Sequence, residues 1–155
     1  MRAEPRAGRC VAGLRLRRQI GQGTQSTVFL AEPVAGGPAV VLKLVSLAGA
    51  DERARQAFLA GADTARRLVH PGIVAVLGAG VEGELGWLAM EAVPGISLGR
   101  YTHPARLLPE PLVLHVAEVV AGALEHAHRQ GVVHRDVKPA NILVHWPSDT
   151  IKLAD

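Results

Sequence analysis

Cysteine, aromatic residues and long apolar runs are all scarce in this sequence. Cys10 is the only cysteine among 155 residues, so no disulfide framework can form within the chain, and a reducing, cytoplasmic location is expected. No apolar run approaches the roughly 20 residues that a membrane-spanning helix needs, and no continuous apolar core follows the charged N-terminus, as a secretory signal would require. Five aromatic residues offer no platform for stacking bases, so nucleic acid is not an expected partner.

Lysine is scarce too, with 3 lysines against 14 arginines. Where arginine serves as the general positive charge, each lysine is a candidate for a specific role, because a compact ammonium meets phosphate as a point charge. The three are Lys43, Lys138 and Lys152. Six of the 17 basic residues lie in the first 18 positions, and we interpret residues 1–13 as a basic, solvated leader.

The first half of the chain predicts short strands separated by glycine-containing turns. Alternating or β-branched runs cover 14–21, 26–32 and 39–46, an alanine- and arginine-rich helix follows at 51–69, and residues 73–93 divide into two strands around a Gly-Glu turn. His70-Pro71-Gly72 ends the helix, because the residue before a proline is driven out of the helical region.

The second half of the chain differs from the first in its predicted secondary structure. Residues 109–131 predict a long amphipathic helix, with Pro111 near its start, Gly131 just past its end and an apolar face of Val113, Val116, Val120, Leu124 and Ala127. Two short strands, 141–144 and 151–154, flank a turn. We predict an α+β fold of two unlike lobes, with a ligand crevice between them.

Two features of the β-rich half suit phosphate binding. Gly21 and Gly23 occupy a turn between strands, where glycine lets backbone N–H groups approach phosphate oxygens; the same pair also fits a plain turn. Lys43 stands in the middle of the apolar strand VVLKLV. It either faces water on an alternating strand or, if buried, needs an anionic partner.

The stretch GVVHRDVKPANILV, residues 131–144, gathers the remaining chemistry. Asp136 can orient an attacking hydroxyl or accept its proton, Lys138 can neutralise charge on a phosphoryl group, and the Asn141 amide oxygen suits a hard cation. Asp155 offers a carboxylate to the same ion. Phosphoryl transfer needs this combination of a positioned nucleophile, bridging metal and fixed positive charge.

HRDVKPAN resembles the catalytic loop of protein kinases, and Lys138 gives it the serine/threonine type. Further matches occur in register: IGQGTQSTVFLA resembles the glycine-rich loop, VVLK the lysine strand, WLAMEAVPGISL the hinge, and IKLAD the approach to the metal-binding aspartate. The whole is similar to bacterial, eukaryotic-like serine/threonine kinases. The resemblance implies a partial kinase domain over 14–155, with an antiparallel β-lobe containing one helix at 14–93, then the hinge and the start of a helical lobe at 94–155.

By this resemblance the cofactors are ATP and Mg²⁺, and the partner is a protein carrying serine or threonine. Asp136 would be the catalytic base with Lys138 at the γ-phosphate, and Asn141 and Asp155 would hold magnesium. Lys43 would grip the α- and β-phosphates. The resemblance implies that further residues contact the nucleotide: Ile20, Gly21, Gly23, Ser26, Val28, Val41, Met90, Glu91, Val93 and Leu143.

The sequence departs from the family pattern at several positions. Ser26 replaces the third loop glycine, and Val41 replaces the usual alanine before the lysine. The glutamate that would pair with Lys43 is expected at position 61, which is Gly61. Asp63 is two positions away and therefore turned about 200° around the helix.

The sequence ends at Asp155, where the family continues with Phe-Gly. We therefore expect a fragment with little activity alone, whose parent protein could be membrane-attached through a later segment. Alternatives remain: a pseudokinase-like binding module, favoured by Gly61; a small-molecule phosphotransferase, opposed by Lys138-Pro139; and, more distantly, a nucleic acid binder using the basic arm. The substrate, the regulatory input and the oligomeric state are not set by the sequence.

Overall fold

The computed structural model of the chain describes residues 6–154, which divide into two compact units. The first contains the residues up to Arg67 together with Val76–Ala92, and the second contains Leu68–Ala75 and the residues from Val93 onward. Asp155, a predicted metal ligand, lies outside the described residues. No helix in the described part is long and apolar enough to cross a bilayer.

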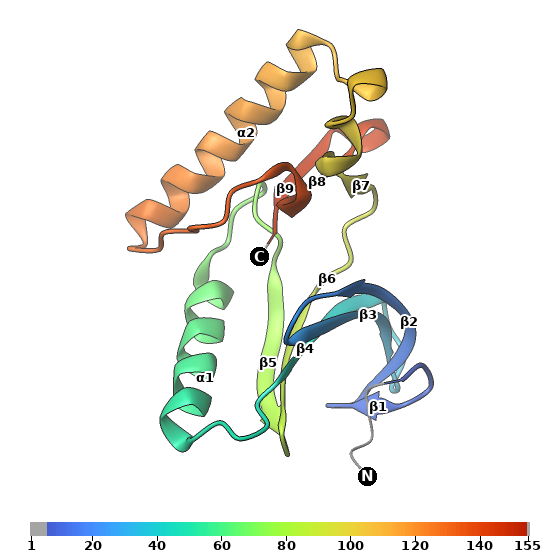
Figure 1. Cartoon of the computed structure of the whole chain (residues 1–155), viewed down its shortest axis with the longest axis vertical. Helices are drawn as coiled ribbons and strands as arrows, with labels where there is room; N and C mark the ends of the chain where they lie inside the picture. Colours follow the sequence, from blue (N-terminus) through green and yellow to red (C-terminus); the bar gives the residue numbers. More distant parts are fainter. Residues whose placement is uncertain (1–5, 155) are drawn as a thin grey trace. The chain divides into compact units, whose positions relative to one another are not determined.

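The first unit is a curled antiparallel sheet covered by one helix (Figure 1). Its strand order is β1-β2-β3-β4-β6-β5. The strands are β1 (Cys10–Val11), β2 (Leu14–Gln22), β3 (Ser26–Pro33), β4 (Val40–Ser46), β5 (Val76–Glu82) and β6 (Leu85–Glu91), and the helix is α1 (Glu52–Arg67). The strand and helix predictions for this half are confirmed to within three residues at each end.

The sheet curls until its two ends meet. The backbone N–H of Ala12, just after edge strand β1, donates to Glu82 Oε2 at the end of edge strand β5, with N and O 2.9 Å apart. The core fills the inside of this curl: Val11, Leu16, Phe29, Ala31, Val40, Leu42, Leu44 and Ala89. Burying these side chains is the main force that holds the sheet in its curl.

Strand β1 corrects the interpretation of residues 1–13 as a solvated leader at Cys10 and Val11, while residues 1–5 lie outside the described range. Cys10 pairs with Arg15 and Val11 with Leu14, and the Val11 side chain is only 1% exposed. Two residues are too short a run to predict as a strand from alternation, and Val11 is ordered because the curl of the sheet supplies an apolar interior for it.

Helix α1 begins at a clear cap and carries an exposed glycine. Asp51 Oδ1 accepts a hydrogen bond from the Ala54 N–H at 2.8 Å, which satisfies one of the free donors of the first turn. Gly61 lies on the solvent side of the helix, and a Cβ atom added there would meet no atom within 4 Å. The helix therefore bears the backbone entropy cost of glycine without any packing reason for it.

We expect Gly61→Ala to raise the free energy of unfolding by about 0.5–1 kcal/mol. The extra methyl group has open space, and alanine loses less backbone freedom on folding than glycine. Urea unfolding followed by circular dichroism measures the change. Gly49→Ala is the control of opposite sign, because Gly49 has open space but a φ of +75°, which alanine adopts with strain. Equal shifts in both variants would contradict the prediction.

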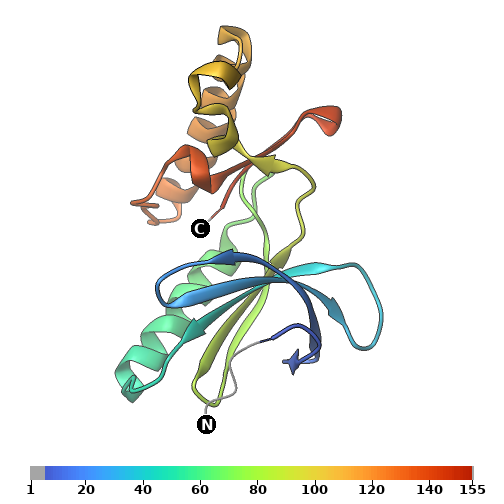
Figure 2. The same cartoon turned by 45° about the vertical axis from the view of Figure 1, so that its right-hand side comes forward.

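The second unit places one long helix against a small sheet (Figure 2). The helix is α2 (Glu110–Arg129), and the sheet order is β7-β8-β9, with strands β7 (Ile96–Ser97), β8 (Ile142–His145) and β9 (Thr150–Leu153). Single-turn 3₁₀ helices cover Leu98–Tyr101, Pro104–Arg106, Pro139–Asn141 and Trp146–Ser148. The core of this unit contains Val116, Val120, Ile142, Val144, Ile151 and Leu153.

The predicted apolar face of α2 is right for most of its length and wrong at its start. Val116, Val120 and Ala127 are buried, whereas Val113 is 50% exposed. Val113 lies in the first turn, where it borders a shallow apolar hollow with Leu107 instead of packing into the core. Helical spacing predicts the direction in which a side chain points, but it does not predict which neighbouring surface covers that side chain.

The C-terminal end of α2 reverses the direction of the chain just before the loop of residues 132–141. Gly131 has a φ of +75°, its N–H donates to the carbonyl of His128, and the N–H of Val132 donates to the carbonyl of Ala127. This pair of bonds is a Schellman motif, which closes the open carbonyls of the last turn and reverses the chain. Residues 132–141 start from that reversal.

Candidate active site

In the first unit, a tight hairpin joins β2 and β3 at the predicted glycine-rich loop. The N–H of Gly23 donates to the Ser26 carbonyl at 2.7 Å, and the N–H of Ser46 on β4 donates to the Gln25 carbonyl at 2.9 Å. A Cβ atom at Gly23 would lie 2.8 Å from Ser26 Oγ, so a larger residue there would require the Ser26 hydroxyl to rotate away. The hairpin presents backbone close to its surface, as phosphate binding needs.

Cross-strand pairing decides which face of the sheet carries Lys43. Leu42 and Leu44 are 0% and 2% exposed and point into the core, so half-buried Lys43 lies on the opposite face. Val28 on β3 is directly opposite Lys43, and Gly21 is directly opposite Val28. Directly paired residues share a face, so Gly21, Val28 and Lys43 form one row across three strands.

The predicted adenine contacts of this unit surround the same row. Val41, two residues from Lys43, shares its face and pairs with Met90 on β6. Met90 is 9% exposed, whereas Ile20 is 45% exposed. Glu91 follows Met90 at the end of β6. The register thus collects most of the predicted nucleotide residues of the β-rich unit on one face.

In the second unit, three predicted residues meet around the Asp136 carboxylate. Lys138 Nζ donates to Asp136 Oδ2 at 2.8 Å, and Asn141 Nδ2 donates to the same oxygen at 2.9 Å and to the Asp136 backbone carbonyl at 2.9 Å. Because its nitrogen makes these two hydrogen bonds, the Asn141 side chain can use its amide oxygen to bind a cation. The side chains of Asp136 and Lys138 remain 56% and 51% exposed, so the cluster is accessible from solvent.

Backbone contacts hold this loop in shape. His134 Nδ1 accepts the Asp136 N–H at 3.2 Å, and Nε2 lies 3.1 Å from the Ala154 carbonyl, which it reaches as a donor in that tautomer. Between them Arg135 has a φ of +65°, an uncommon conformation for a residue with a side chain. The Ala154 N–H donates to the Asn141 carbonyl at 2.8 Å. Ala154, directly after β9, therefore contacts both the start of the loop, at His134, and its end, at Asn141.

Ser97 is a positioning residue that the sequence did not indicate. Its Oγ lies 3.1 Å from the Ala140 carbonyl and 3.3 Å from the Pro139 carbonyl, and it also accepts the Gly99 N–H at 3.1 Å. Ser97 thereby anchors the 3₁₀ turn that carries Asn141. Serine is common before short turns, so its presence at position 97 does not by itself predict a contact with the loop. The fold brings it to residues 42 and 43 positions away in the sequence.

Val93 and Leu143, the predicted nucleotide contacts of this unit, are half-buried. Leu143 pairs with Ser97 and with Lys152 on the sheet face opposite the buried Ile142 and Val144. Among residues 6–154 no three His, Cys, Asp or Glu side chains gather closely enough to hold a metal ion. The predicted metal pair combines the Asn141 amide with Asp155, so its carboxylate lies beyond that range.

Two hydrogen bonds lower the pKa of Asp136. The bond from Lys138 is the largest cause and the bond from Asn141 the second, because both favour the charged carboxylate. The lowered pKa means that Asp136 is ionised at neutral pH, and any stability it contributes is lost as the pH falls through that lowered value. The carboxylate is therefore suited to orient a hydroxyl, and is a weak base in the resting state.

We expect Lys138→Met to raise the pKa of Asp136 toward its ordinary value of 3.8. The substitution removes both the hydrogen bond and the positive charge, while a side chain of similar length remains. Carbon-detected NMR titration of the carboxyl group gives the value directly. Lys152→Met is the control and leaves the Asp136 titration unchanged. An identical Asp136 pKa in the wild type and Lys138→Met would show that the ion pair is absent in solution.

Comparison with known proteins identifies the class to which this fold and loop belong. The protein kinase domain family model matches residues 14–155. The chain therefore belongs to the protein kinase domain family. Its matched relatives include serine/threonine-protein kinases PknJ and PknF of Mycobacterium tuberculosis, 40% identical over 148 residues and 39% over 156, which cover 93% and 96% of this chain.

The same chain covers 24% of PknJ and 32% of PknF, so it spans about a quarter to a third of these relatives. Among solved structures, the kinase domain of M. tuberculosis PknI superposes with a TM-score of 0.83 at 35% identity, covering 98% of this chain and 62% of that one. Rad53 residues 1–466 superpose with a TM-score of 0.82 at 25% identity, covering 92% and 38%. The predicted protein kinase fold, an antiparallel β-lobe with one helix and the start of a helical lobe, is confirmed.

Proposed function

We propose that this chain carries the nucleotide-binding and catalytic-loop residues of an enzyme that phosphorylates serine or threonine hydroxyls of proteins with ATP. The observation that carries the proposal is the Asp136 carboxylate, held by Lys138 and Asn141 in a loop matched by the kinase family model. Relatives that are named serine/threonine-protein kinases support the same substrate class.

The reaction assigns a separate task to each loop residue. The substrate hydroxyl oxygen forms a bond to the γ-phosphorus, the bond from that phosphorus to the β,γ-bridging oxygen breaks, and ADP leaves. Asp136 orients the hydroxyl and receives its proton as the new bond forms. Lys138, already 2.8 Å from Asp136, offsets negative charge on the transferred group.

We assign nucleotide-contact roles to residues within each unit separately. Lys43 and the hairpin of Gly21, Gly23 and Ser26 are assigned to the phosphates. The adenine contacts are assigned to Ile20, Val28, Val41, Met90, Glu91, Val93 and Leu143. The structural relative Rad53 was solved in complex with AMP-PNP, which supports a nucleotide as the ligand of this fold.

Magnesium fits the donors that the loop offers. The Asn141 amide oxygen is the hard type of ligand that Mg²⁺ accepts, and Asp155 would add a carboxylate. When bound, the ion would neutralise charge on the phosphates. We place the protein in the cytoplasm, because a single cysteine indicates no need for an oxidising compartment.

Nucleotide binding followed by phosphate transfer tests this function. Calorimetric titration of the 155-residue chain with ATP and magnesium should show saturable binding that needs the metal. Lys43→Met should weaken it about tenfold or more, while the control Lys152→Met leaves it unchanged. Phosphate transfer is tested in a longer protein that contains the whole kinase domain, where radiolabelled phosphate from ATP should appear on serine or threonine of a generic basic protein; the 155-residue chain by itself is expected to transfer little. Absence of any magnesium-dependent ATP binding contradicts the proposal.

Gly61 favours a second candidate, a pseudokinase-like module that binds nucleotide without transferring phosphate. The family pattern expects a glutamate there to pair with Lys43, and the exposed Gly61 offers no side chain. Because position 61 opens into free space, glutamate can be introduced without a clash. In the longer protein, magnesium-dependent ATP binding without phosphate transfer in the wild type, with transfer gained in Gly61→Glu but not in Gly61→Gln, would establish this candidate.

A further inference from the structure

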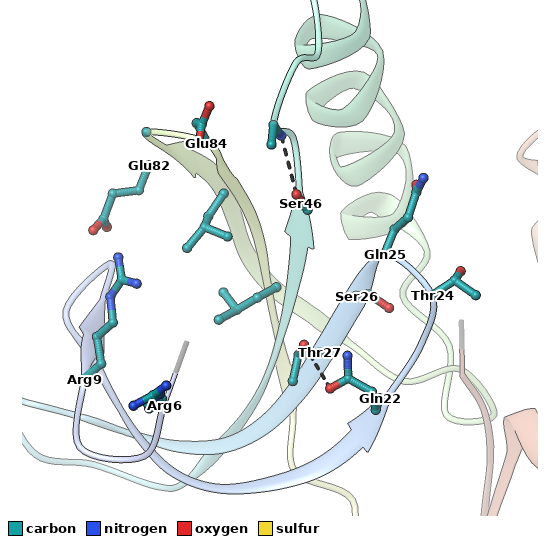
Figure 3. A pocket seen from close by; sticks show the side chains of 14 residues that line it. Arg6, Arg9, Gln22, Thr24, Gln25, Ser26, Thr27, Ser46, Glu82 and Glu84 are labelled. Carbon is teal, nitrogen blue, oxygen red and sulfur yellow. Dashed lines mark hydrogen bonds between the residues drawn. The ribbon is translucent and has the colours of Figure 1, made fainter. Parts of the chain in front are cut away.

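One unassigned feature of the first unit is a cavity at the mouth of the curled sheet. It encloses about 700 Å³, and its walls come from the residues before β1, the β2–β3 hairpin, the end of β4 and the β5–β6 turn (Figure 3). The cavity lies mainly on the core side of the sheet, because Thr27 and Leu44, which line it, pair with each other on the face opposite Lys43. Among its described lining residues, Ser26 is shared with the phosphate assignment above. Mouths of curled or closed sheets are common ligand sites.

The cavity has a polar rim with charges of both signs. Arg6 and Arg9 contribute guanidinium groups, and Glu82 and Glu84 contribute carboxylates from the β5–β6 turn. One Glu82 oxygen accepts the Ala12 N–H, and Arg9 and Glu84 also take part in interactions within the protein, so a ligand would share these groups. The four formal charges cancel, which favours a ligand that is itself zwitterionic.

The remaining lining suits peptide bonds. Gln22 and Gln25 each offer an amide donor and acceptor, and Thr24, Ser26 and Ser46 offer hydroxyl groups that serve in either role. Leu44 and Leu85 provide an apolar floor. None of the described residues that line the cavity is aromatic, so no stacking surface for a base or a sugar is present. Two carboxylates on the rim oppose a polyphosphate.

We propose that this cavity is a regulatory site for a short zwitterionic peptide. The peptide carboxylate would bind the Arg6 side, where a guanidinium can form paired hydrogen bonds, and the ammonium would bind the Glu84 side. An apolar side chain would lie on Leu44 and Leu85. Figure 3 shows Arg6 and Arg9 on one side of the cavity region and the hairpin residues Thr24 and Gln25 on the other, so the lining comes from two separate segments.

Regulation follows from the position of the hairpin, and it rests on the proposed nucleotide function. Thr24 and Gln25 are exposed, and the Ser46 N–H to Gln25 carbonyl bond ties this tip to β4. A peptide that bridges the tip and the β5–β6 turn would restrict the hairpin to fewer positions. Since the opposite face of the same hairpin is assigned to phosphate, restricting it should tighten ATP binding.

NMR titration of the isotope-labelled 155-residue chain with Gly-Leu-Gly tests the binding step. We expect saturable shifts at Thr24, Gln25 and Glu84, and binding at least fivefold weaker in Arg6→Gln and in Glu84→Gln. The matched controls Arg66→Gln and Glu110→Gln, at exposed charges outside the cavity, should bind like the wild type. N-acetyl-Gly-Leu-Gly-amide, which lacks both charges, should bind at least tenfold more weakly.

The regulatory step is read separately, from ATP titrations with and without saturating Gly-Leu-Gly. A threefold or larger gain in ATP affinity, lost in Glu84→Gln, supports the proposal. Equal binding of the charged and blocked peptides, no saturable shifts, or an ATP affinity changed less than twofold overturns it. Peptide binding in a chain that binds no ATP supports the peptide site and overturns both the regulatory step and the proposed function.

Discussion

Asp136→Asn should lower the rate of protein phosphorylation about 10²–10⁴-fold and leave the affinity for ATP within about threefold. Asparagine keeps the shape of the side chain but removes the negative charge that receives the hydroxyl proton. It also turns one carboxylate oxygen into an N–H₂ donor, which cannot accept the hydrogen bonds that Lys138 and Asn141 make to Asp136. Initial rates with radiolabelled ATP and calorimetric ATP titrations measure the two effects.

Asp149→Asn is the matched control for this experiment. Asp149 is an exposed carboxylate in the β8–β9 turn, where it pairs with His115 and has a φ of +48°, a conformation that asparagine tolerates. Its replacement should leave the rate unchanged. If Asp136→Asn kept more than a tenth of the wild-type rate, Asp136 would not be the residue that accepts the proton.

Gly95→Ala should lower the free energy of unfolding by about 3 kcal/mol or more. Gly95 has a φ of +115°, and a Cβ atom there would contact the Val144 carbonyl oxygen, with the carbonyl carbon 2.8 Å away and His145 Cβ 2.9 Å away. The β7–β8 pairing of Ile96 with Val144 would have to separate, and with it the buried Val144 of the second core. Urea denaturation with circular dichroism gives the change.

Gly131→Ala separates the steric clash from the effect of backbone conformation. Gly131 also has a positive φ, +75°, but a Cβ atom there meets nothing within 4 Å. It should cost only about 1 kcal/mol, the usual penalty for alanine in place of a glycine that ends a helix. Equal losses in the two variants would mean that β7 moves away from Val144 without cost.

The loop chemistry was predictable because it is local in sequence. His134, Asp136, Lys138 and Asn141 lie within eight positions, and their hydrogen bonds form within the loop or to the adjoining β9. The strands around Lys43 were predictable for a similar reason, since alternation and β-branched residues report on each strand by itself. Their roles in phosphate transfer remain predictions that the variants above test.

Other features could not be obtained from such local signals. Strand β1 exists because the curl of the sheet offers Val11 an interior, and Val113 is exposed although it lies on the predicted apolar face of α2. Ser97 reaches the catalytic loop only because β7 pairs with β8. Each outcome depends on contacts between segments far apart in the chain.

The sequence alone determined the kinase-type loop, the strand that carries Lys43 and the absence of a side chain at Gly61. Only the tertiary structure decided that Lys43 shares a face with Val28 and Gly21, and that charged groups from two distant segments line one cavity. The reason is physical: residue types and spacing specify local conformation, whereas the face a side chain occupies depends on the register between strands and on which surfaces are buried together.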